Sequence, residues 1–73
     1  MRYTIEYEEE EDGRWIAEIP EVPGVLAYGN TQELAGRAAI ALFLRVLADR
    51  AEHGEGEFGS PAGSRLDLQL APA

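Results

Sequence analysis

The sequence predicts an α+β fold, a single small domain in which an antiparallel sheet carries one helix on one face. Three observations predict it: short segments that alternate apolar and polar residues, one long segment with helical periodicity, and turn residues between them. In chain order these give β-β-β-α-β. With 73 residues the chain has room for one domain, so residues 1–73 are expected to form it.

The first two strands are predicted over residues 2–8 and 14–19, where apolar side chains alternate with polar ones. A three-residue loop over residues 11–13 pairs Tyr7 with Ala17 and keeps the apolar faces of the two strands together. A two-residue loop would place Tyr7 opposite an acidic residue. The longer loop is therefore expected, with its glycine in the left-handed conformation.

A rigid turn over residues 20–24 is expected next, because its two prolines cannot donate to a sheet. A short third strand follows over Val25 to Tyr28. Asn30 and Thr31 are both candidate N-caps for the helix after it.

The helix is predicted from about Thr31 to His53, with Gly54 ending it. Its apolar residues span an arc of roughly 160°, wider than the ~100° stripe of a surface helix, so the helix is expected to cover the sheet and part of a partner. Gly36 lies inside this arc, through close approach of another backbone or by chance. The opposite side carries two expected ion pairs, Glu33–Arg37 and Arg45–Asp49.

Residues 54–64 are expected to form a flexible Gly-rich loop that leads to a last strand over Arg65 to Leu70. That strand could pair within the chain or on a second subunit. No C-terminal DNA-binding domain is expected. The core is expected to hold five aromatic residues: Tyr3, Tyr7, Trp15, Tyr28 and Phe43.

The charge balance favours a basic protein partner. The formal net charge is −8, all six cations are Arg, and residues 1–23 contribute −6 of the total. Phosphate is repelled by such a surface, so direct nucleic-acid binding is not expected. So small a core favours a homodimer or higher homo-oligomer. No apolar run is long enough for a membrane span, which makes a cytoplasmic protein the default expectation.

No catalytic, cofactor or metal site is expected from the residue types. Cysteine is absent, and the single histidine, His53, has too few candidate ligands near it for a metal site. The acidic run over residues 8–12 is open to several interpretations: a solvated hairpin tip, a docking patch, a carboxylate pair or a metal site. Neighbouring residues of a strand face opposite ways, so these five side chains are not expected to converge on one ion.

Three segments, taken together, resemble the HicB-like antitoxins of bacterial HicA/HicB toxin–antitoxin pairs. They are Glu11-Asp12-Gly13-Arg14-Trp15, Pro20-Glu21-Val22-Pro23-Gly24 and Gly29-Asn30-Thr31-Gln32-Glu33-Leu34-Ala35. The resemblance covers residues 3–53 and implies a partial ribonuclease-H-like fold without catalytic activity. It also implies that the protein binds a HicA-like toxin, a small basic nuclease that cleaves messenger RNA, and covers its active surface.

By this analogy the expected partner contacts are at the hairpin tip: Glu9, Glu10, Glu11, Asp12 and Arg14. Short members of the family stand alone, so the alternative is an orphan homo-oligomeric module that binds another basic protein. A small enzyme is the third hypothesis.

Overall fold

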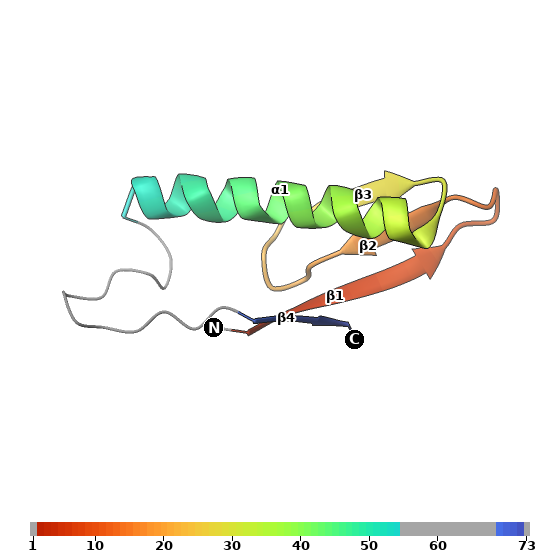
Figure 1. Cartoon of the computed structure of the whole chain (residues 1–73), viewed down its shortest axis with the longest axis horizontal. Helices are drawn as coiled ribbons and strands as arrows, with labels where there is room; N and C mark the ends of the chain where they lie inside the picture. Colours follow the sequence, from red (N-terminus) through yellow and green to blue (C-terminus); the bar gives the residue numbers. More distant parts are fainter. Residues whose placement is uncertain (1, 55–68, 73) are drawn as a thin grey trace.

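The structure is a computed structural model that describes residues 2–54 and 69–72. It contains strands β1 (Arg2–Glu9), β2 (Trp15–Glu18), β3 (Leu26–Gly29) and β4 (Gln69–Pro72) and one helix, α1 (Gln32–Glu52). The α+β class and the order β-β-β-α-β are confirmed. Figure 1 shows two layers, with α1 lying along one face of the sheet.

The strand order in the sheet is β3-β2-β1-β4. The three N-terminal strands are antiparallel, as predicted, but β4 runs parallel to β1, so the sheet is mixed. The helical crossover between β3 and β4 makes this direction possible. Of the predicted last strand, residues 65–68 lie outside the described residues, as do residues 55–64 of the predicted loop. The described strand continues to Pro72.

The hairpin between β1 and β2 has the predicted three-residue loop and register. Tyr7 lies opposite Ala17. The loop is closed by the Glu10 backbone N–H, which donates to the Arg14 carbonyl with N and O 2.6 Å apart. Gly13 has a φ of +91°, the left-handed conformation that glycine adopts without strain.

Two consecutive turns join β2 to β3. The Val22 N–H donates to the Ile19 carbonyl (3.0 Å), and the Val25 N–H donates to the Val22 carbonyl (3.1 Å). In the second turn Pro23 and Gly24 are the central residues, and the φ of +90° at Gly24 is what a type II turn requires at that position. The rigid turn predicted for residues 20–24 is therefore confirmed, and it brings β3 back beside β2.

Thr31, and not Asn30, is the N-cap of α1. Its Oγ1 accepts a hydrogen bond from the Leu34 backbone N–H at 3.1 Å. At the other end His53 is the C-cap, and Gly54 follows with a φ of +71°. The predicted helix boundaries are correct to within one residue.

The core lies between α1 and the face of the sheet that it covers. Its buried residues are Tyr3, Ile5, Ala17, Ile19, Val22, Val25, Ala35, Ala39, Phe43 and Leu47. The rings of Tyr3 and Phe43 meet edge to face, with their centroids 4.8 Å apart. After Leu47 no residue of α1 is buried, and Figure 1 shows this end of the helix running past the sheet.

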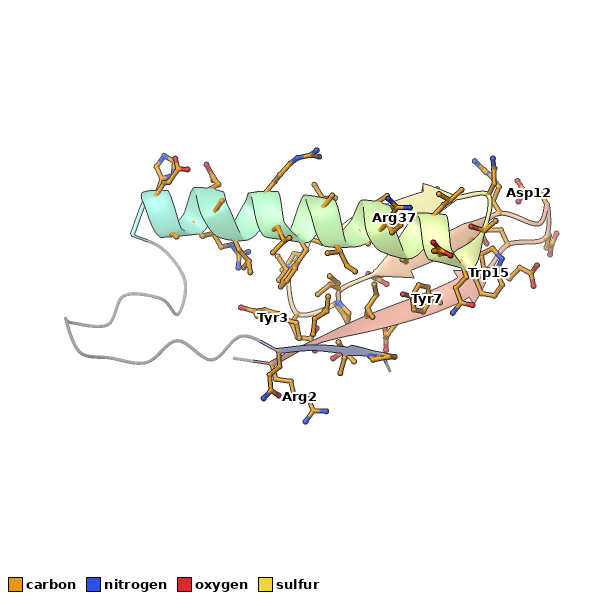
Figure 2. All side chains as sticks on the ribbon, viewed as in Figure 1. Arg2, Tyr3, Tyr7, Asp12, Trp15 and Arg37 are labelled. Atoms are coloured by element: carbon orange, nitrogen blue, oxygen red, sulfur yellow. The ribbon has the colours of Figure 1, made fainter. Side chains whose placement is uncertain are left out.

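The prediction of a core position is wrong for one aromatic residue, Tyr28. Tyr28 is 50% exposed, because the register of β3 places it on the face of the sheet that α1 does not cover. Tyr7 and Trp15 are half-buried and pack against the core. Figure 2 shows Tyr3 and Tyr7 on the side of β1 that faces the helix.

Two glycines allow α1 to lie close to the sheet. A Cβ atom on Gly29 would lie 2.3 Å from the Ala35 backbone nitrogen, so this strand residue touches the helix backbone itself. On Gly36 a Cβ atom would lie 2.6 Å from the Tyr7 hydroxyl oxygen. The close approach at Gly36 is therefore made by a side chain, whereas a backbone approach occurs at Gly29.

The two ion pairs predicted on the exposed side of α1 are not formed. In the described part of the chain Arg14 forms an ion pair with Asp12, and the ring of His53 lies beside Asp49. The Nδ1 atom of His53 lies 2.7 Å from the Asp49 carbonyl oxygen and 3.4 Å from its carboxylate. Asp49 therefore has His53, at the end of the helix, beside it in place of the predicted Arg45.

Candidate functional site

The uncovered face of the sheet is the first candidate surface. Because side chains alternate along a strand, the residues next to the buried ones point away from α1. We call this surface the open face, and it consists of Glu6, Glu8, Ile16, Glu18, Leu26 and Tyr28. Among the described residues, the Arg14 side chain lies over one end of it, at the Tyr28 ring.

The strand register orders the open face into two rows that cross the sheet. One row runs from Glu8 through Ile16 to Tyr28, and the other runs from Glu6 through Glu18 to Leu26. The carboxylates therefore lie on the β1 side of the face and the apolar groups on the β3 side, with Glu18 between them. A shallow depression lies over the β1–β2 part and is lined in part by Glu6, Glu8 and Ile16.

The apolar side of the open face is unusually accessible. Leu26 is 40% exposed and Tyr28 is 50% exposed, while Ile16, on the neighbouring strand β2, is half-buried. Adjacent exposed apolar side chains favour an interaction surface.

The acidic side carries an unfavourable arrangement. Glu6 lies directly opposite Glu18 on the neighbouring strand, and like charges in this position destabilise a sheet. None of the three carboxylates of the open face, those of Glu6, Glu8 and Glu18, forms an ion pair with a described residue. A cation from outside would relieve this repulsion.

The hairpin tip, defined as Glu10 to Arg14, is the second candidate surface and adjoins the first. The Asp12 carboxylate accepts a hydrogen bond from the Arg14 backbone N–H (3.0 Å) and lies 2.9 Å from the Arg14 Nε atom. The backbone hydrogen bond is the chief cause that holds the pKa of Asp12 below its ordinary value of 3.8, with the guanidinium adding to it. The Arg14 Cζ atom also lies 5.3 Å from the centre of the Tyr28 ring, a cation–π contact.

The structure brings together four of the five residues predicted from the family resemblance. Glu10, Glu11, Asp12 and Arg14 line one small depression at the tip. Glu9 is the last residue of β1 and lies opposite Trp15, on the helix side of the strand. Figure 2 shows Asp12 at the far end of the hairpin. The tip is solvent-exposed apart from Glu10, which is half-buried.

A further carboxylate supports the turn beside the open face. The Glu21 side chain accepts a hydrogen bond from the Thr4 backbone N–H at 3.0 Å and another from the Thr4 hydroxyl. These bonds, the hydroxyl one first, lower the pKa of Glu21 from its ordinary value of 4.5. The Glu21 carboxylate thus binds Thr4 of β1 at a level of the sheet that lies beyond the end of β2. Its role is therefore to hold the turn against β1.

Reasoning from the sequence missed the open face as a site. The signal was available in the strand parity, since residues of even number alternate with the apolar residues of β1 and β2. Extending the same parity through the register of β3 would have placed Leu26 and Tyr28 beside Ile16. The aromatic character of Tyr28 favoured a core position instead.

Among residues 2–54 and 69–72, no group of three or more His, Asp or Glu side chains is placed to hold a metal ion. Within these ranges no helix combines the length and apolar character needed to cross a membrane. Comparison of the chain with protein-family models, with curated proteins and with solved structures finds no match.

Proposed function

We propose that the protein is a small acidic binding module that recognises a basic protein, and that it acts in the cytoplasm as an antitoxin of the HicB-like kind. Its partner is then a small basic nuclease that cleaves messenger RNA. In this role the protein binds and does not catalyse. The observation that carries the proposal is the open face, where exposed apolar groups lie beside carboxylates that form no ion pair with a described residue.

Electrostatics explain why such a surface would inhibit a nuclease that handles RNA. The cations with which a nuclease holds phosphate groups also attract a protein of net charge −8. Charge complementarity speeds the encounter and places the inhibitor over the surface that RNA would use. The resemblance of residues 3–53 to HicB-like antitoxins supports the same partner class.

Exposed leucines on α1 support the alternative, an orphan homo-oligomeric module for another basic protein. Two leucines on α1 remain accessible, Leu34 at 48% and Leu44 at 51%. Burial of such side chains between subunits would supplement a small core. A homodimer is also compatible with the antitoxin role, so oligomeric state alone does not separate the two.

The test is a pull-down from the native cell extract, with the bound proteins identified by mass spectrometry and assayed for RNA cleavage. The antitoxin proposal predicts a small basic nuclease whose activity falls as the protein is added back. Its release should increase with salt, because exposed charge pairs are screened.

Two double variants of equal charge provide the control. Glu6→Gln/Glu18→Gln alters the open face, and Glu33→Gln/Glu52→Gln alters α1. Inhibition should weaken more in the open-face variant. Recovery of the protein alone, as a stable oligomer, or of a partner without nuclease activity would overturn the antitoxin proposal, and the second result would favour the orphan module.

A further inference from the structure

We propose that the open face is the docking site for an amphipathic, arginine-bearing helix of the partner protein. This inference rests on the proposed function, which it deepens by naming the surface and the element that occupies it. The hairpin tip, by contrast, was the surface expected from the sequence.

The layout of the open face matches an amphipathic element. Its carboxylates lie towards β1 and its apolar side chains towards β3, and β1 and β3, with β2 between them, are about 10 Å apart. A helix is ~10 Å across, so one helix spans this distance. Its apolar stripe would rest on Ile16, Leu26 and Tyr28, and its cations would reach Glu6 and Glu8.

A second copy of the chain does not suit this face. Two open faces packed together would bring two sets of three carboxylates into contact, and none of these carboxylates forms an ion pair with a described residue. Like charges that are desolvated together oppose association. The face therefore selects a partner of opposite charge.

The protein's own Arg14 indicates which cation fits. Its guanidinium already lies against the Tyr28 ring at 5.3 Å and against the Asp12 carboxylate at 2.9 Å. An aromatic ring next to a carboxylate suits a planar guanidinium better than an ammonium group. Tyr28 has half of its surface still exposed, and Glu18 lies diagonally across from it on the neighbouring strand β2. The same pairing of ring and carboxylate is thus available to an arginine from the partner.

The experiment titrates the ¹⁵N-labelled full chain with a synthetic Ala-based helical peptide that carries a Leu stripe flanked by Arg. Backbone amide shifts should move along the open face, at Ile16, Glu18 and Tyr28, and stay small on α1. The same peptide with Lys in place of Arg should bind more weakly, and a Glu version should not bind.

Matched variants locate the charge effect. Glu6→Gln/Glu18→Gln should weaken peptide binding by about fivefold, and Glu33→Gln/Glu52→Gln, with the same net charge, by less than about twofold. Tyr28→Ala should remove the preference for Arg over Lys. Equal losses in both double variants, or shifts centred on the hairpin tip or on α1, would overturn the inference.

The nuclease assay separates this failure from failure of the proposed function. If Glu6→Gln/Glu18→Gln inhibits the recovered nuclease as well as the parent does, the docking site is wrong while the antitoxin role stands. If the peptide maps to the open face and no nuclease is recovered, the docking site stands and the antitoxin role fails.

Discussion

Replacing Gly29 with alanine tests how α1 is held against the sheet. Gly29 ends β3, and a Cβ atom built on it would lie 2.3 Å from the Ala35 nitrogen and 2.8 Å from the Leu34 carbonyl carbon. Both are backbone atoms in the first turn of α1, so no side chain can turn aside. The φ of Gly29 is not positive, so the destabilisation expected from the substitution is steric and not a matter of backbone strain.

The magnitude follows from the displacement required. To restore ordinary contact, the first turn of α1 must move by about 1 Å from β3, against the close packing of the core. Overpacking of this kind costs about 3 kcal/mol. A chain of 73 residues has a free energy of unfolding on the order of 4–11 kcal/mol, so the loss is a large fraction of it. The melting temperature should fall by roughly 12–24 °C.

Urea and thermal unfolding, followed by circular dichroism and by the fluorescence of the single tryptophan, Trp15, measure this loss. Gly36→Ala is the matched control, because its new methyl meets only the end of the Tyr7 side chain, which can turn. There the gain of about 1 kcal/mol in helix propensity offsets the repacking. A Gly29→Ala protein as stable as Gly36→Ala would refute the backbone contact between β3 and α1.

The remaining predictions concern the core, the helix cap and a carboxylate. Phe43→Ala should lower the free energy of unfolding by about 3–5 kcal/mol, because the ring is 2% exposed; a loss under ~1 kcal/mol in urea unfolding would contradict its central place. Thr31→Ala should cost about 1 kcal/mol and Asn30→Ala much less, since only the former removes the cap bond; equal urea midpoints would show that the cap is misassigned. The pKa of Glu21 is lowered on folding by its bonds from Thr4, so its stabilisation is complete above pH 4.5 and is lost as the pH falls through the lower folded pKa. Glu21→Gln should therefore be less stable at neutral pH and lose less stability on acidification, and urea midpoints with a parent-like acid dependence would exclude this role.

Local rules predicted the elements of this fold well, because each depended on residues close in sequence. Parity fixed the hairpin, since only one loop length pairs Tyr7 with Ala17. Gly13 and Gly24 could be placed in turns because each turn needs a positive φ at that position. Gly54 likewise marked the end of the helix.

What local rules did not supply was anything set by packing between distant segments. The parallel direction of β4 depends on the path of the crossover, which leaves no pattern in residues 69–72. The side of the sheet that α1 covers decides whether Tyr28 is core or surface, and an aromatic residue in a strand is typical of both. At the surface, Asp49 had two possible partners at helical spacing, Arg45 and His53, and the ring of His53 is the one that lies beside it.

The division of the sheet into a covered and an open face also bears on function. The covered face brings α1 so close that two glycines are required, and all the described buried residues lie in this layer or in the turn beside it. The open face, by contrast, does not stabilise the isolated domain, because it keeps Glu6 opposite Glu18 and leaves Leu26 and Tyr28 accessible. An arrangement that reduces the stability of the isolated domain becomes favourable once a cationic, apolar surface covers it. Of the two faces of the sheet, the open face is therefore the one whose burial against such a surface would stabilise the domain more.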